Sequence, residues 1–329
     1  MNSYGTLFKV TLYGESHQEA IGVVVDGMPS GIKIDEALIK SDLEKRKPHA
    51  VGTTPRKETD KVHLLSGVFN NYSTGSPIHL MIKNENIKSS DYSHLKKQPR
   101  PGHADYVSNI KYQGFQDYRG GGRFSGRLTA ALVAAGSLAK MIIPFEFSHK
   151  LIQVGTLKDM DQLDDYLKMV TEQGDSVGGI IEVRVKKMMV GLGEPFFNKL
   201  DGEIGKMMLS IPAVKAVSIG EGFDGIEKFG SEFNDTIVDK TGKSLTNHSG
   251  GTSGGISNGN DLVVKVFVKP TSSIQKEQQT LDLETNEVEP LLIGGRHDVC
   301  IARRIGIVLE NTIAIVLADL FLMNRAYQQ

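Results

Sequence analysis

The chain has 329 residues, 39% of them hydrophobic and 23% charged, so it can bury a sizeable core, and we expect one compact unit over residues 1–329. Its formal net charge of −1 gives no overall attraction to nucleic acid or to an anionic membrane surface. A single cysteine, Cys300, excludes an internal disulfide framework, and the N-terminal segment MNSYGTLFKV has no secretory pattern. Together these features indicate a cytoplasmic protein.

The first half of the chain predicts a strand, a capped helix and a buried helix, in that order. Ile21 to Val25 is an apolar run closed by a Gly/Pro turn, which is typical of a strand. Asp35 can cap a helix that runs to about Arg46, where a proline follows closely. Leu128 to Ala139 is apolar but too short to span a bilayer, which takes roughly 20 apolar residues, so it predicts a buried helix.

The second half repeats the order of strand, turn and helix. Ile180 to Val185 alternates like a strand, Lys199 to Leu209 resembles a helix, and Leu262 to Val268 predicts another strand. Ile305 to Met323 is apolar but interrupted by acidic residues, which favours a second buried helix. Interleaved strands and helices favour an α/β layered fold. The repeated order suggests two related halves, although coincidence accounts for it equally well.

Glycine and arginine are concentrated in YRGGGRFSGR, Tyr118 to Arg127. Three successive glycines leave backbone N–H groups accessible, and Arg119, Arg123 and Arg127 flank them with forked donors. The segment enters the helix expected from Leu128, whose N-terminus adds partial positive charge. It therefore indicates an anion site, although a glycine-rich turn that only connects two elements fits the same pattern.

Basic residues are dense in two segments of the first half. Lys40 to Lys57 holds six Lys/Arg against two acidic residues, and Lys96 to Arg127 holds seven against two. These segments fit either solvated basic faces or the walls of a site for an anionic ligand. RNA binding would need interleaved aromatic motifs and an overall basic charge, so we expect no nucleic-acid partner.

Other polar clusters are YGESHQEAIG, GGTSGGISNG, KPTSSI and GGRHDVC. Ser16 precedes His17 in the first, but sequence neighbours rarely form a nucleophile and base pair, because such partners meet across a fold. In the last, His297 beside Asp298 fits an ordinary capped turn as well as a site. The nine histidines show no metal-ligand spacing, and no P-loop or G-x-G-x-x-G segment stands in the right context, so we expect no metal and no standard nucleotide motif.

Taken in order, ten segments of this chain resemble the chorismate synthase family: GESH, DGMPSGI, TTPRKETD, SGVF, RPGHAD, GGGR, SIPAVK, GGISNG, KPTSSI and GRHD. The resemblance implies a βαβ sandwich with two pseudo-related halves and an internal helical layer, assembled as a homotetramer. It implies anti elimination of phosphate from 5-enolpyruvylshikimate 3-phosphate to give chorismate, a lyase reaction of the shikimate pathway. The implied cofactor is reduced FMN, which lends electron density to the leaving step and recovers it. Since no segment remains for a reductase module, a separate NAD(P)H-dependent flavin reductase is the expected electron source.

The resemblance also assigns roles to residues. His17 matches the histidine thought to protonate the leaving phosphate, and His103 matches the one that keeps the flavin correctly protonated. Ser16 and Asp298 match residues proposed to help the flavin N5 remove the ring proton. The residues matched to FMN contacts are Arg123, Phe124, Ser125, Ala213, Gly254, Lys269, Pro270, Thr271, Ser272, Ser273 and Arg296. A substrate with two carboxylates and a phosphate needs fixed cations, and the candidates are Arg46, Arg123, Arg127 and Arg296.

Five positions depart from the family pattern: Gln18 stands for Gly, Phe124 for a hydroxyl residue, Leu128 for a carboxylate and Val299 for Pro, and Gly52 is nearest to a missing arginine. The alternative function is therefore a catalytically weakened paralogue that binds only a flavin or a phosphorylated ligand.

Overall fold

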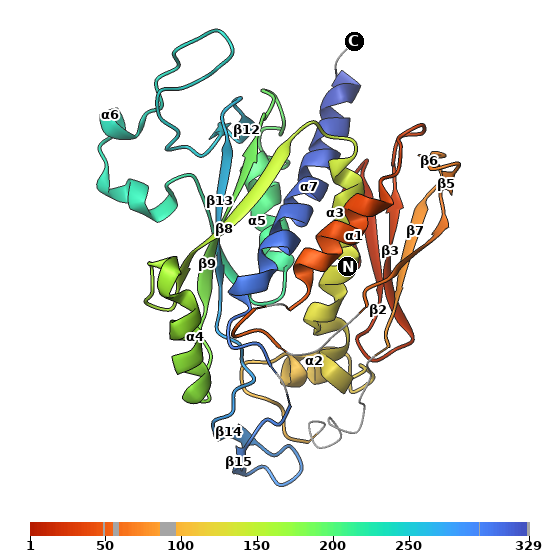
Figure 1. Ribbon diagram of the computed structural model, residues 1–329, viewed down its shortest axis with the longest axis vertical. Helices are drawn as coiled ribbons and strands as arrows, with labels where there is room; N and C mark the ends of the chain where they lie inside the picture. Colours follow the sequence, from red (N-terminus) through yellow and green to blue (C-terminus); the bar gives the residue numbers. More distant parts are fainter. Residues whose placement is uncertain (49, 55–58, 86–96, 296, 328–329) are drawn as a thin grey trace.

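Two antiparallel sheets enclose a layer of helices in the computed structural model of the chain (Figure 1). The structure describes residues 1–48, 50–54, 59–85, 97–295 and 297–327. The first sheet has the strand order β1-β2-β3-β7-β4, and the second has the order β10-β13-β9-β8. Their strands are β1 Ser3–Tyr4, β2 Lys9–Gly14, β3 Ala20–Asp26, β4 Val62–Ser66, β7 Ile78–Lys83, β8 Glu146–Val154, β9 Gly179–Lys186, β10 Val214–Ile219 and β13 Leu262–Val268.

Four helices lie between the sheets, and smaller elements lie around them (Figure 1). The inner helices are α1 Glu36–Arg46, α3 Thr129–Lys140, α5 Leu200–Ser210 and α7 Ala302–Tyr327. The other helices and turns are α2 Asp105–Lys111, α4 Leu163–Glu172, α6 Gly230–Phe233, η2 Arg119–Phe124, η3 Gly126–Leu128, η4 Met160–Gln162 and η5 Gly222–Glu227. Three hairpins pair β5 Val68–Phe69 with β6 Tyr72–Ser73, β11 Thr252–Ser253 with β12 Ile256–Ser257, and β14 Gln278–Leu281 with β15 Val288–Leu291.

Helix α1 begins and ends where the sequence predicts. The Asp35 carboxylate accepts a hydrogen bond of 3.0 Å from the Leu38 backbone N–H, which satisfies one of the unpaired donors of the first turn. At the other end Lys47 is extended, because the proline that follows disfavours helical geometry at the preceding residue. The Asp35 cap therefore sets the start of the helix. Because the helix then runs for 11 residues, Arg46 lies on its last turn.

The predicted strands are also confirmed. β3 places Ile21, Val23 and Val25 on the buried face of the first sheet, as its apolar run predicts. β13 extends from Leu262 to Val268 and pairs with β10 on one side and with β9 on the other, so it is a central strand. The strand-to-helix order β3–α1 recurs as β9–α5, one in each sheet, so each half of the chain contributes a sheet to the shared helical layer.

The core centres on α3 and α7, which pack directly against each other. Gly136 of α3 permits this contact, since an added Cβ would lie 2.3 Å from the Asn311 carbonyl oxygen of α7. By length and composition α7 could cross a membrane, but 89% of its most apolar window is buried inside the fold. Both apolar segments are therefore core helices, as the sequence predicts.

Helix α7 also holds the N-terminal segment. The Asp319 carboxylate of α7 accepts hydrogen bonds of 2.7–3.0 Å from the backbone N–H groups of Thr6, Leu7 and Phe8. Phe8 is fully buried and leads into β2. One carboxylate near the end of the chain therefore fixes the entry into the first sheet.

Candidate active site

A cavity of about 1240 Å³ opens where the ends of elements from both halves meet. Its wall includes the end of β2, the last residue of α1 and the first turns of α3 and α7. Residues 209–215, from the end of α5 to the start of β10, and residues 269–273, after β13, complete the wall. Two helix N-termini carry partial positive charge, so their position at this cavity favours an anionic ligand.

The glycine-rich segment lies in this wall and leads into α3. Gly120, Gly121 and Gly122 all have positive φ angles, of 58°, 81° and 49°. Only glycine adopts such a run without strain, and the result is a compact turn in which Gly120 and Gly121 are partly exposed and Gly122 is buried. Ser125 follows the turn, and its hydroxyl accepts a hydrogen bond from the Arg127 backbone N–H at 3.3 Å. The predicted arrangement of glycines at a helix N-terminus is thus confirmed.

Ser16 and His17 pack against the backbone of this turn. Ser16 Oγ lies 3.1 Å from His17 Nδ1 and 3.1–3.2 Å from the carbonyl oxygens of Arg119 and Gly120. A Cβ added to Gly120 would lie 2.0 Å from His17 Cε1, so the imidazole occupies the space that a side chain would need. The glycine at position 120 is therefore required for the position of His17.

Gln18 joins the His17 segment to the glycine-rich turn through Asp117. Its Nε2 donates a hydrogen bond of 3.0 Å to Asp117 Oδ2, and Arg119 donates two of 2.8 Å to the same carboxylate. The Arg119 hydrogen bond holds the pKa of Asp117 below its usual range. The side chain at this departure from the family pattern thus contacts the turn and adds a link to it.

His103 lies in the turn before α2, and this turn contacts the segment that contains Lys269 and Ser273. Its Nε2 is 2.8 Å from Ser273 Oγ, and Lys269 Nζ donates a hydrogen bond of 2.7 Å to the carbonyl oxygen of Gly102. Burial disfavours the imidazolium, and the nearby Arg100 guanidinium adds repulsion, so the pKa of His103 falls to about 4. The imidazole is therefore neutral at pH 7, and it donates a hydrogen bond from one ring nitrogen and accepts one at the other.

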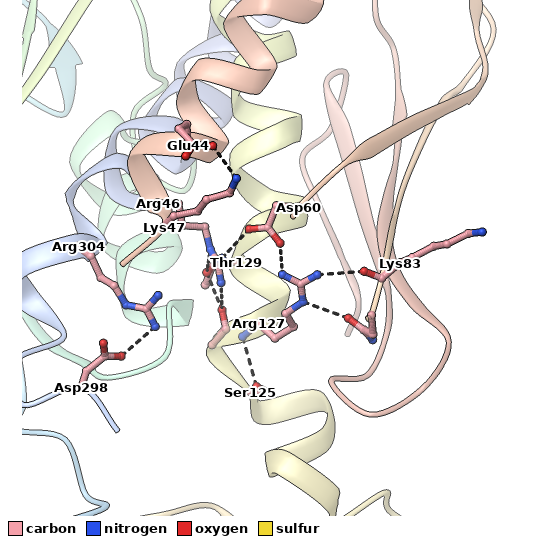
Figure 2. A network of polar contacts seen from close by, with 12 residues as sticks. Glu44, Arg46, Lys47, Asp60, Lys83, Ser125, Arg127, Thr129, Asp298 and Arg304 are labelled. Carbon is pink, nitrogen blue, oxygen red and sulfur yellow. Dashed lines mark hydrogen bonds and ion pairs between the residues drawn. The ribbon is translucent and has the colours of Figure 1, made fainter. Parts of the chain in front are cut away.

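Arg46 and Arg127 share one buried carboxylate, that of Asp60 (Figure 2). Arg46 NH1 lies 3.1 Å from Asp60 Oδ2, and Arg127 NH1 contacts Asp60 Oδ1. Asp60 has a side chain that is only 1% exposed, and all three residues lie in the cavity wall. Two of the predicted substrate cations are thus fixed side by side.

Arg123 is the third cation of the wall. Its guanidinium donates hydrogen bonds of 2.9–3.1 Å to the carbonyl oxygens of Leu12 and Gly14 and to the Asn2 amide oxygen. Burial lowers the pKa of Arg123, although it remains a cation at any ordinary pH. These three acceptors are neutral oxygens, and the nearby Glu15 carboxylate stabilises the charged guanidinium from a greater distance.

Asp298 is held by one contact with a distant segment and one with the start of α7. Its Oδ1 accepts a hydrogen bond of 2.9 Å from the Thr54 backbone N–H, and its Oδ2 accepts one of 2.8 Å from Arg304 (Figure 2). The neighbouring Val299 N–H donates to the Gly52 carbonyl oxygen at 2.8 Å. Asp298 is therefore part of a built site rather than a local cap, which was the alternative interpretation of the sequence.

Most of the predicted site residues meet in this cavity. Those in its wall are Arg46, His103, Arg123, Phe124, Ser125, Arg127, Ala213, Lys269, Pro270, Thr271, Ser272, Ser273 and Asp298. Ser16 and His17 lie behind Gly120, which is itself in the wall. Gly254 lies in the turn between β11 and β12, outside the wall, and Arg296 lies outside the described residues.

Three functional candidates were missed by sequence reasoning: Asp60, Arg100 and Arg304. Asp60 and Arg100 belong to the quoted segments TTPRKETD and RPGHAD, so the signal was present, but no spacing rule connects them to their partners. Arg304 lies outside every quoted motif, and only the fold places it beside Asp298.

Comparison with known proteins agrees with this geometry. The family model described as chorismate synthase matches residues 8–322. A chorismate synthase of Chitinophaga pinensis is 50% identical over 99% of this chain and 98% of its own length, and one of Methanocaldococcus jannaschii is 40% identical over 98% and 96%. A crystal structure of chorismate synthase superposes with a TM-score of 0.75 at 25% identity, covering 97% of this chain and 93% of that one. The chain therefore belongs to the chorismate synthase family.

Proposed function

We propose that the chain eliminates phosphate from 5-enolpyruvylshikimate 3-phosphate to give chorismate, with reduced FMN as cofactor, in the shikimate pathway. One observation carries the proposal: His103, Asp298 and Arg123 line a single cavity, and His17 packs against Gly120 in its wall. These residues come from distant parts of the sequence, so their convergence supports a common chemical task.

The wall around residues 269–273 fits a phosphate-bearing flavin. Thr271 Oγ1 is buried and has no hydrogen-bond partner within the described part of the chain, so it can serve a ligand. Gly102 packs closely on the neighbouring Ser272, because an added Cβ at Gly102 would lie 2.7 Å from Ser272 Oγ. Lys269 adds a cation, and burial lowers its pKa. When bound, reduced FMN would supply the electron density that assists departure of the phosphate.

The chain itself would bind the anion and manage its protons. Arg123 donates its hydrogen bonds to neutral oxygens and lies in the cavity wall, and its positive charge suits a substrate with three anionic groups. His17 Nδ1 lies 3.1 Å from Ser16 Oγ, and we propose that this imidazole delivers a proton to the leaving phosphate. His103 is neutral at pH 7 and would hold a hydrogen bond at the flavin without adding charge.

The test is an anaerobic assay with purified protein, dithionite-reduced FMN and the enolpyruvyl substrate, in which chorismate formation is measured. His17→Asn keeps a hydrogen-bond donor but cannot deliver a proton at neutral pH, so turnover should fall about 10²- to 10⁴-fold with FMN binding retained. Parent-like turnover in this variant would reject the role of His17. Bound FMN without chorismate from the parent protein would favour the weakened paralogue.

We further propose a homotetramer that receives reduced FMN from a separate NAD(P)H-dependent reductase. Large apolar side chains are exposed on one projecting segment, residues 222–246, and this supports burial against another subunit. They are Phe223, Ile226, Phe229, Ile237, Val238 and Leu245, each at least 53% exposed. Light scattering after size exclusion tests the assembly, and a monomer at micromolar concentration would contradict it.

A further inference from the structure

Asp60 is the feature that links two cations of the cavity wall. Arg46 stands on the last turn of α1, Arg127 lies just before α3, and Asp60 precedes β4 (Figure 2). The side chains of Arg46 and Arg127 are only 7% and 10% exposed, against 1% for Asp60. All three belong to the cavity wall, so the carboxylate acts at the site and not at a distant point of the fold.

We infer that Asp60 is a positioning residue that holds the Arg46 and Arg127 guanidiniums in the orientation that receives an oxyanion. The identity of the reacting ligand rests on the proposed function, whereas the anion chemistry does not. A phosphate or carboxylate of the substrate and the phosphate of FMN share this chemistry, and the experiment below separates them. Without a shared counter-ion the two guanidiniums would repel each other and lose their common orientation.

Asp60 is common to both arginines, and other described residues also accept hydrogen bonds from each of them. Arg46 donates to Thr129 Oγ1 at 3.0 Å and to the Gly126 carbonyl oxygen at 3.1 Å. These contacts fix the direction of one guanidinium edge but cannot offset its charge. Loss of the Asp60 charge would therefore loosen the charged end of Arg46 while its neutral contacts remain.

Arg127 is held in the same way. It donates to Asn84 Oδ1 at 3.0 Å and to the Lys83 carbonyl oxygen at 3.2 Å, which are again neutral acceptors. The three charged groups Arg46, Arg127 and Asp60 sum to one net positive charge, since two cations meet one carboxylate. Eight Lys/Arg side chains and five Asp/Glu side chains of the described residues line the cavity, so its wall retains an attraction for an anion.

Asp60→Asn is a suitable variant because the backbone at Asp60 has a φ angle of 47°. Asparagine tolerates this left-handed region as well as aspartate does, and it keeps the side-chain volume. Two possible roles of Asp60 predict opposite changes in anion affinity for this variant. If Asp60 only offsets charge, its neutralisation adds net positive charge and tightens anion binding. If Asp60 positions the arginines, anion binding weakens.

The experiment measures binding of inorganic phosphate by calorimetry at low salt in the parent and in Asp60→Asn. We expect phosphate affinity to fall about tenfold or more, and the KM for the enolpyruvyl substrate to rise in parallel with a smaller change in kcat. Titration of oxidised FMN separates the two anion sources: unchanged FMN affinity with a raised substrate KM assigns the anion to the substrate, and lost FMN affinity assigns it to the flavin phosphate. Either result supports the inference.

Asp42→Asn is the matched control. Asp42 also has a side chain that is 1% exposed and also pairs with two cations, Lys45 and Lys140, but it lies outside the cavity wall. The control should lose comparable thermal stability and keep the phosphate affinity of the parent. If Asp60→Asn does not fold, Asp60→Glu keeps the charge but moves the carboxylate outward, and it too should weaken phosphate binding.

Several results would overturn the inference. They are a parent protein that does not bind phosphate, a folded Asp60→Asn protein that binds phosphate as tightly as the parent or more tightly, and unchanged affinity in Asp60→Glu. The phosphate titration does not depend on chorismate formation. A parent that binds phosphate but makes no chorismate therefore rejects the proposed function and leaves the role of Asp60 to be decided by its own titration.

Discussion

Replacement of Gly120 by alanine should displace His17. Gly120 has a φ angle of 58°, and an added methyl group would lie 2.0 Å from His17 Cε1, 2.3 Å from its Nδ1 and 3.0 Å from Ser16 Oγ. Carbon atoms in contact normally stay about 3.5 Å apart, so the imidazole must move by roughly 1.5 Å or the turn must open. Both outcomes remove the proposed proton donor from its place.

The magnitude has two parts. A left-handed backbone costs a non-glycine residue roughly 1–2 kcal/mol, which lowers stability by a few degrees in melting temperature. A misplacement of about 1 Å at a reacting group costs about 100-fold in rate, or roughly 2.7 kcal/mol at 1.36 kcal/mol per tenfold. We therefore expect kcat of Gly120→Ala to fall at least about 100-fold in the anaerobic chorismate assay.

Gly121→Ala is the matched control. Gly121 has a φ angle of 81°, so its alanine variant carries similar backbone strain, but the nearest described atom to the methyl group would be Ser125 Cβ, at 3.9 Å. This variant should lose similar thermal stability and keep kcat within a few-fold of the parent at saturating substrate. Equal kcat values in folded Gly120→Ala and Gly121→Ala would refute the argument, because the clash with His17 is what distinguishes them.

Three further changes test the neighbouring groups. The pKa of His103 is about 4 in the folded state against about 6.5 in the unfolded state, so the stability that its neutral form gives is fully present above pH 6.5 and is lost as pH falls toward 4, by up to about 3 kcal/mol. His103→Asn should therefore flatten the fall in melting temperature between pH 7 and 4.5. An unchanged slope would contradict this. Arg123→Ala should raise the substrate KM by about 30-fold or more. Lys97→Ala, at a side chain that is 56% exposed, should change the KM by less than about threefold. Equal effects of the two substitutions would show that Arg123 contributes no more to substrate binding than an exposed surface charge. Gln18→Gly removes the bond to Asp117, so it should lower stability by about 1 kcal/mol with kcat within about threefold of the parent; a large gain or loss in turnover would show that Gln18 acts on His17 directly.

Local signals predicted much of the fold. The Asp35 cap gave the start of α1, and the alternating run Leu262 to Val268 gave the bounds of β13. The direction and order of the strands could not be predicted, because a hydrophobic pattern specifies which face of a strand is buried and not which strand lies beside it. That information comes from pairings such as β13 with β9, across more than seventy residues.

For the candidate active site too, the sequence predicted individual residues but not the contacts between them. Residue types and their motifs identified His103 and the segment that contains Ser273, but not the 2.8 Å contact between them across 170 positions. Asp60 was quoted only as the last letter of a motif, since a carboxylate shared by two arginines has no local signature. Sequence reasoning placed Gly254 with the cofactor residues, and whether it contacts FMN stays a prediction.

The contact between Asp319 and the N–H groups of Thr6, Leu7 and Phe8 has a consequence for biosynthesis. A chain leaves the ribosome from its N-terminus, so the first strands are made long before the helix that fixes them. Helix α7 also packs on β8 and β9, so the second sheet cannot complete its packing until the same helix has been synthesised. Neither half can reach its final packing during translation, and folding must finish after position 319 has emerged. A messenger truncated before the codons for α7 would therefore yield a chain in which α3 and the strands β8 and β9 lack the helix that packs on them, which is a substrate for chaperones and proteases.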